Sequence, residues 1–107
     1  MVVVVCRARF VIPCKNSLKE KRSFVQSAMK RMKSRYNLSI SEIDDLDIYD
    51  LLTLGISSVS RSAKSSKLLV DESIVFLETS FGVECIEAKH EILTYSEGTP
   101  FFFDINN

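Results

Sequence analysis

The sequence predicts an α+β domain of the ferredoxin-like class, with a four-stranded antiparallel sheet and two helices on one face. Segments of period two and segments of helical period follow one another in the order β-α-β-β-α-β, which is the split βαβ arrangement. Right-handed crossovers make the first and third strands central and place the last strand beside the first. A chain of 107 residues forms one domain and buries roughly 65% of its unfolded surface.

The first strand is predicted in "VVVVCRARFVI", where apolar residues alternate and Pro13 ends the pattern. The even-numbered side, from Val2 to Ile12, is expected to face the core. Arg7 and Arg9 then project from the opposite face of the sheet.

The first helix is predicted to begin at Ser17, because Ser17 and Glu20 form an S-x-x-E capping box. In that motif the Ser17 hydroxyl accepts from the Glu20 amide, and the Glu20 carboxylate accepts from the Ser17 amide. Apolar residues at helical spacing then define the buried face. They are Leu18, Val25, Ala28, Met29, Met32 and Tyr36.

The rest of the domain is predicted to form two strands, a second helix and a last strand. A short strand "LSISEI" and an acidic connection "DDLDIYD" precede the strand "LLTLGISSV", in which Gly55 is expected to allow a close approach or a bulge. A second helix is predicted from Ser62 to Phe81, with Gly82 as its C-terminal cap, followed by the strand "VECIEAKHEILTY". Residues 1–95 form the domain and 96–107 a tail, whose aromatic residues are expected to pack on the edge of the domain or, alternatively, into a second copy.

Formal charge is zero overall but is unevenly distributed. Residues 1–35 contain ten Lys or Arg and one acid, whereas 36–107 contain four Lys or Arg and thirteen acids. An anionic partner is therefore compatible with the zero sum. The three cysteines form no C-x-x-C motif, and the apolar N-terminus is too short for a signal peptide or a membrane span, so we expect a cytoplasmic protein without a disulfide framework.

The main candidate site is a cluster of cations at and along the first helix. Its members, proposed to contact nucleic acid, are Lys15, Lys19, Lys21, Arg22, Lys30 and Lys33. Such residues neutralise phosphates, and here they lie almost without acids and crowd a helix N-terminus, where the macrodipole disfavours cations. The alternative is that they only solvate a helix surface.

For the other candidate residues, the sequence favours structural roles. Arg7 and Arg9 lack the aromatic neighbours on which RNA bases stack. Glu87 and Glu91 are expected to pair with these two arginines. The apolar remainder of this sheet face could form a dimer surface. His90 is expected on the inward side, with Cys85 on the opposite face, so that they form no metal site.

Two further groups of residues are candidates for chemistry, a cysteine and a set of acids. Cys14, near Lys15, could have a lowered pKa. The acidic turn residues are expected to be solvated rather than to hold a cation. They are Asp44, Asp45, Asp47 and Asp50. No catalytic residue, metal or cofactor is therefore expected.

The segment "SLKEKRSFVQSAMKRMKSRYNLSISEID" resembles the hallmark segment of the YlxP-like family, a bacterial domain of unknown function (number 503). The likeness continues through "LGISSVS" to "HEIL", and so covers roughly residues 1–93. Asp47 and Tyr49 stand where the family usually has an Asp and a Trp. The resemblance implies a ferredoxin-like fold. Genes of the family often sit beside those of translation initiation factor two and ribosome-binding factor A, and this neighbourhood suggests ribosome-related work. It supplies no catalytic residue.

These observations together predict a non-enzymatic RNA- or ribosome-associated binding module that uses its basic first helix. The alternative is a homodimeric protein-interaction domain. A small enzyme or ligand sensor on the same fold is the third hypothesis.

Overall fold

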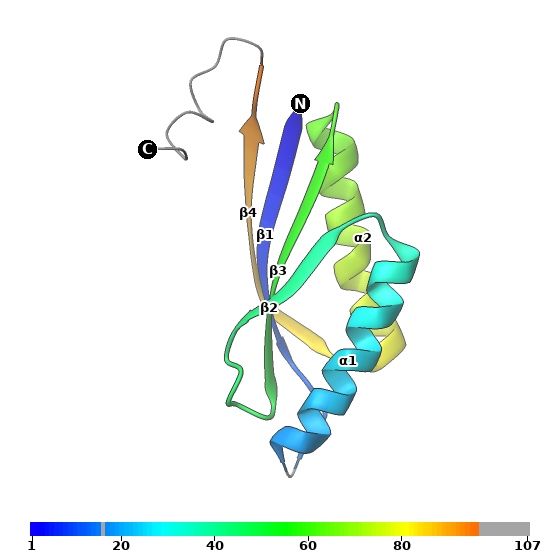
Figure 1. The fold of residues 1–107 in the computed structure, drawn as a ribbon, viewed down its shortest axis with the longest axis vertical. Coiled ribbons are helices and arrows are strands. Elements are labelled where there is room, and N and C mark those ends of the chain that lie inside the picture. The colour runs from blue at the N-terminus through cyan, green and yellow to red at the C-terminus, as the bar shows by residue number, and fades with distance from the viewer. Residues whose placement is uncertain (16, 97–107) are drawn as a thin grey trace.

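The computed structural model describes residues 1–15 and 17–96. Its elements are β1 (Val2–Val11), α1 (Leu18–Arg35), β2 (Ser39–Asp44), β3 (Leu51–Ser60), α2 (Ala63–Phe81) and β4 (Glu84–Thr94). Figure 1 shows two layers, with both helices covering one face of the sheet. The predicted fold class is confirmed, and the expectations for the tail beyond Ser96 lie outside the described residues.

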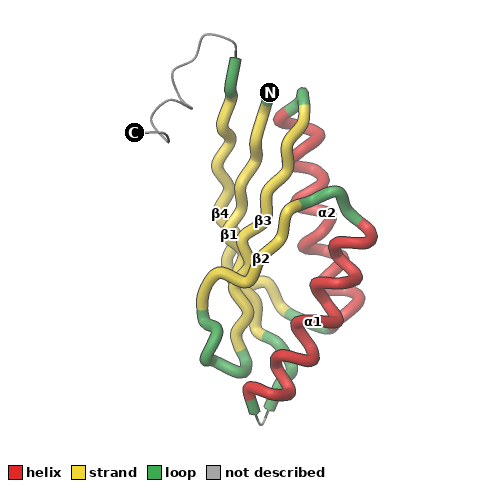
Figure 2. Tube along the Cα trace, viewed as in Figure 1, coloured by secondary structure: helices red, strands yellow, loops and turns green. Residues whose placement is uncertain are grey.

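The sheet has the strand order β2-β3-β1-β4, and all three pairings are antiparallel. The strands β1 and β3 are central and β4 lies beside β1, as predicted (Figure 2). Register places Arg7 between Gly55 of β3 and Lys89 of β4. One face of the sheet is therefore left without a helix, and the odd-numbered residues of β1 lie on it.

The core lies between the sheet and the helices. The even-numbered side of β1 is buried from Val4 through Ile12, as its alternation predicted. Residues at helical spacing on α1 and α2 pack against it. Those that are buried are Val25, Ala28, Met32, Val70, Ile74, Phe76 and Leu77.

The helix ends follow the local sequence. The Ser17 Oγ accepts from the Glu20 amide at 3.1 Å, and Gly82 ends α2 in the left-handed region with φ +65°. The second half of the predicted capping box is wrong, because the Glu20 carboxylate accepts from the Lys15 amide at 3.3 Å instead of the Ser17 amide.

Ile43 lies on the helix-free face over Gly55, at a bulge in β2. The β2–β3 register shifts between Glu42 and Asp44, and the Ile43 Cγ2 lies 3.0 Å from the position that a Cβ on Gly55 would occupy. The predicted close approach at Gly55 is therefore confirmed.

A second bulge, in β4, overturns one expectation. The β1–β4 register shifts between Arg9 and Phe10, so that Cys85 pairs with the buried Phe10 and packs against the core. His90 pairs with the buried Cys6. Cys85 and His90 therefore lie on the same face of the sheet, and their predicted placement on opposite faces was wrong because an extra residue changes the parity of a strand.

Candidate nucleic-acid interface

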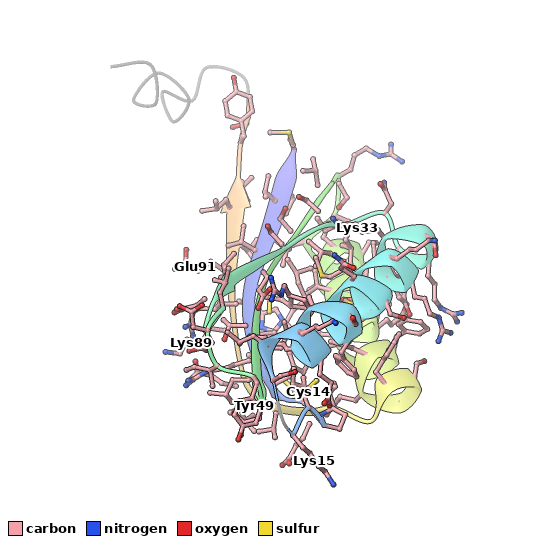
Figure 3. All side chains as sticks on the ribbon, turned by 60° about the horizontal axis from the view of Figure 1, so that its bottom comes forward. Cys14, Lys15, Lys33, Tyr49, Lys89 and Glu91 are labelled. Carbon is pink, nitrogen blue, oxygen red and sulfur yellow. The ribbon has the colours of Figure 1, made fainter. Side chains whose placement is uncertain are left out.

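Four cations of α1 lie on one side of the helix. Their positions, 19, 22, 30 and 33, fall within about 80° on a helix of 3.6 residues per turn and span about 21 Å along its axis. Lys15 precedes the helix, and Figure 3 shows it and Lys33 near opposite ends of α1. We call this set the basic stripe. It consists of Lys15, Lys19, Arg22, Lys30 and Lys33.

All five cations of the basic stripe are exposed. Within residues 1–15 and 17–96, the ion pairs of the molecule involve other cations, and no member of the basic stripe takes part in one. Its positive charge is therefore not neutralised by the described part of the chain.

Lys21 departs from the sequence expectation, because it is buried with only 2% of its surface exposed. Its Nζ donates to the Asp45 carbonyl oxygen at 2.6 Å and lies 3.1 Å from the Glu42 Oε2. Lys21 therefore binds the β2–β3 turn and is not part of the surface. The signal was in the sequence, because Lys21 stands four residues before Val25 and seven before Ala28, on the buried row of the helix.

Two arginines of α1 were not singled out from the sequence. The Arg35 guanidinium lies 4.9 Å from the Phe76 ring centroid, and that of Arg31 lies 5.3 Å from the centroids of Phe76 and Phe81. These stacked contacts join α1 to α2 while both arginines stay exposed. No one-dimensional pattern predicts them, because they depend on how the two helices pack.

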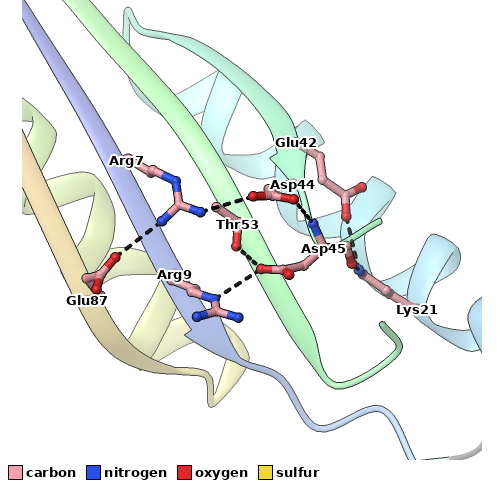
Figure 4. Close-up of polar contacts among 8 residues, drawn as sticks. All are labelled: Arg7, Arg9, Lys21, Glu42, Asp44, Asp45, Thr53 and Glu87. Carbon is pink, nitrogen blue, oxygen red and sulfur yellow. Dashed lines mark hydrogen bonds and ion pairs between the residues drawn. The ribbon is translucent and has the colours of Figure 1, made fainter. Parts of the chain in front are cut away.

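The arginines of the helix-free face are paired, in contrast to the basic stripe. The Arg7 guanidinium lies 3.1 Å from Asp44 and 3.2 Å from Glu87, and the Arg9 Nε lies 3.0 Å from the Asp45 Oδ2 (Figure 4). The predicted pairing with Glu87 is confirmed. The pairing expected of Glu91 is wrong, because Glu91 lies opposite Val5. Asp44 at the end of β2 and Asp45 in the turn that follows supply the other partners.

Asp45 is the centre of that turn. Its backbone is left-handed, with φ 57°, and its Oδ2 accepts from the Thr53 hydroxyl at 2.6 Å as well as from Arg9. The Thr53 hydrogen bond, and then Arg9, lower the pKa of the Asp45 carboxyl from its ordinary value of 3.8. The expectation of a solvated acidic turn fits the exposed Asp47 and Asp50 and is wrong for Asp45, which has a structural role.

A trough of about 580 Å³ opens on the helix-free face. Its apolar floor includes Val5 and Ile43 around Gly55, and Lys89 and Glu91 stand on its β4 side (Figure 3). None of the residues that line the trough is aromatic. The platform on which RNA-recognition modules stack bases is therefore missing from this trough, as the sequence suggested.

Cys6 and Cys14 are buried, and His90 pairs with a carboxylate of α2. Burial, followed by the negative charge of Asp71, raises the pKa of Cys6 to about 11. Burial also raises the pKa of Cys14, so the lowered pKa considered for that thiol is wrong. The His90 Nε2 lies 2.9 Å from the Asp71 Oδ1, which joins β4 to α2.

Two absences concern only the described residues. Among residues 1–15 and 17–96, no group of three or more His, Cys, Asp or Glu could hold a metal ion. Neither of the helices in that part of the chain is long and apolar enough to cross a membrane.

Comparison with known proteins places the chain among relatives without an assigned role. Residues 3–90 match the model of a protein family of unknown function, DUF503. The chain is 32% identical over 63 residues to the uncharacterized protein YlxP of Bacillus subtilis (strain 168), over 59% of this chain and 68% of that protein.

Solved structures give distant likenesses. The cofactor-independent oxygenase SnoaB from Streptomyces nogalater is 12% identical with a TM-score of 0.49, over 94% of this chain and 99% of that one. A dimeric ferredoxin-like protein from an uncultured marine organism is 12% identical with a TM-score of 0.46, over 90% and 99%. At such low sequence identity and structural similarity, neither the activity nor the oligomeric state of these proteins can be assigned to this chain. The family match, in contrast, spans most of the chain, and this protein therefore belongs to the DUF503 family that its sequence resembled.

Proposed function

We propose that this protein is a non-enzymatic module that binds structured RNA, free or within a ribosomal particle, through the basic stripe. The observation that supports this most is the contrast between the basic stripe and the two arginines of the helix-free face. The cations Arg7 and Arg9 on the helix-free face are neutralised by carboxylates, whereas the five cations of the basic stripe are exposed and have no described ion pair.

The length of the basic stripe favours a polyanion. Lys19 and Lys33 are fourteen residues apart on α1, or about 21 Å along the helix axis. A small anion reaches one end of this row, whereas a nucleic-acid backbone carries phosphates along all of it. Each cation that replaces a condensed counterion contributes to affinity, so the binding weakens as salt rises.

Structured RNA suits this surface better than unstacked bases do. Recognition of splayed bases requires exposed aromatic rings, and the row of exposed cations on α1 carries none. The aromatic ring of Phe24, on the same helix, packs instead against Phe81 of α2 at 5.8 Å. Contact through phosphates and shape is the mode that remains.

A homodimeric interaction domain is the second candidate. Exposed apolar side chains lie on the helix-free face, where Val59, Ile43 and Leu93 are 61%, 49% and 38% exposed. Self-association through this face would bury them together with the trough. Light scattering across a concentration series tests this candidate separately, because it does not depend on the charge of α1.

The experiment for RNA binding compares two charge reversals of equal size. The variant Lys19→Glu with Arg22→Glu reverses the N-terminal end of the basic stripe. Its matched control is Arg61→Glu with Lys64→Glu, two exposed cations that have no described ion pair and lie just before and in the first turn of α2. Acids near helix N-termini are favourable, so both variants are expected to fold.

The proposal predicts that the α1 variant loses more than tenfold in affinity for structured RNA or ribosomal particles, and that the α2 variant loses much less. Equal affinities of both variants and the unaltered protein would contradict it.

A further inference from the structure

A hollow of about 480 Å³ opens where α1 ends and β2 begins. Lys33, the last cation of the basic stripe, stands at its rim, and the chain from Asn37 to Ser39 leads past it into β2. The wall on the other side comes from Ser57 and Val59 of β3. The hollow therefore continues the basic stripe onto the edge of the sheet.

Three polar side chains around this hollow have no partner in the described part of the chain. Lys33, Asn37 and Ser39 are exposed, and none of their side chains has a hydrogen bond or ion pair in the part of the chain that the structure describes. An ammonium, an amide and a hydroxyl without a described partner thus line one hollow.

The arrangement fits a sugar-phosphate unit better than a phosphate alone. The last carbonyl groups of α1 carry partial negative charge, which disfavours an anion at the very end of the helix. A phosphate is therefore best placed at the Lys33 ammonium. Asn37 and Ser39 can both donate and accept, as a ribose hydroxyl does. Apolar atoms of Leu38 and Val59 supply a surface for the carbon side of the sugar.

We propose that this hollow binds a ribose-phosphate unit of RNA, with Lys33 on the phosphate and with Asn37 and Ser39 on the 2′-hydroxyl. The site selects RNA over DNA, because the 2′-hydroxyl is the group by which a protein distinguishes them. DNA has no 2′-hydroxyl, so the Asn37 amide and the Ser39 hydroxyl would lack a hydrogen-bond partner in the complex. This inference rests on the proposed RNA-binding function and adds the selectivity that the basic stripe, as a row of charges, does not provide.

The test compares a short RNA duplex with a DNA duplex of the same sequence, each titrated with the whole chain at several salt concentrations. The unaltered protein is expected to bind RNA about tenfold more tightly, the ratio that one or two hydrogen bonds supply. Asn37→Ala with Ser39→Ala is expected to bring the ratio close to one while affinity for DNA and the salt dependence stay the same. Lys33→Gln is expected to lower the salt slope by about one for both duplexes.

Matched controls separate the site from general damage. Ser41→Ala removes a hydroxyl from the same face of β2, two residues from Ser39 and outside the hollow, and is expected to leave the ratio unchanged. Asn37 has no left-handed backbone, so alanine fits there without strain, and melting temperatures are expected to match.

Two results would overturn the inference while the proposed function stands. One is equal affinity of the unaltered protein for RNA and DNA, and the other is a preference for RNA that survives the double alanine substitution. Binding to neither duplex would contradict the proposed function itself, and the inference with it.

Discussion

The ammonium of Lys21 on α1 donates to the main-chain carbonyl oxygen of Asp45, 2.6 Å away in the turn after β2. The same Nζ lies 3.1 Å from the Glu42 Oε2, which has no aligned hydrogen bond within the described residues. Lys21 is therefore the charge that compensates a shielded carboxylate, and it joins the first turn of α1 to the β2–β3 turn (Figure 4).

Removal of this cation is expected to destabilise the fold. Lys21→Met leaves the Glu42 carboxylate unpaired and should lower the free energy of unfolding by about 2 kcal/mol. This loss is smaller than is usual for a broken buried pair, because the Glu42 side chain is 22% exposed. Urea unfolding measures this loss. Lys19→Met, two residues away and on the exposed side of the helix, is the control and should change stability by less than about 0.5 kcal/mol.

A rescue sharpens that prediction. Glu42→Leu in the Lys21→Met background removes the uncompensated carboxylate and should recover much of the lost stability. If the double variant is no more stable than Lys21→Met, the pairing does not explain the loss. Lys21→Met should also keep the salt dependence of RNA binding, since Lys21 lies outside the basic stripe.

The cap of α1 gives a second prediction. Ser17→Ala removes the hydroxyl that accepts from the Glu20 amide and should lower the free energy of unfolding by about 1 kcal/mol. Ser23→Ala, at an exposed position inside the same helix, should be neutral or slightly stabilising. Equal losses in the two variants would mean that the cap has no special role.

Gly55 tests the close approach on the helix-free face. A Cβ there would lie 3.0 Å from the Ile43 Cγ2, so Gly55→Ala should cost about 1 kcal/mol unless Ile43 moves. In an Ile43→Ala background the same change should become neutral or stabilising, because alanine reduces the freedom of the unfolded chain. A double-mutant cycle with no coupling would show that the contact is unimportant.

Acid should weaken the fold through Asp45. Its folded pKa lies below the ordinary value of 3.8, mainly because Thr53 and then Arg9 hydrogen-bond its charged form. A carboxyl with a lowered folded pKa contributes stability above its unfolded pKa, and this contribution is lost as pH falls through the folded value.

Asp45→Asn is the matching variant, since asparagine tolerates the left-handed backbone that Asp45 adopts. It should be less stable than the unaltered protein near neutral pH, and the two unfolding curves should converge as pH falls below about 4. A difference that stays constant down to the lowest pH would exclude ionisation of Asp45 as the cause.

The fold could be predicted from the sequence because its signals are local. Alternation in β1, helical spacing in α1 and the Gly82 cap each depend on residues close together in the chain. Cys85 was misplaced because a bulge changes strand parity without a mark in the sequence. The burial of Lys21 follows from its place on the buried row of α1, but its partner does not, because the β2–β3 turn is distant in the sequence. The structural role of Asp45 could not be predicted because its partners Arg9 and Thr53 come from β1 and β3, and only the folded sheet places them beside the turn.

The most direct test of the central proposal is the salt dependence of RNA binding. If all five cations of the basic stripe contact phosphates, the logarithm of the association constant for an RNA duplex should fall with the logarithm of salt concentration with a slope of about −4.5. Lys19→Gln with Arg22→Gln should reduce the slope by about two, because two phosphate contacts are lost. A slope near zero, or a slope that the double variant leaves unchanged, would contradict the assignment of the basic stripe as an RNA-binding surface.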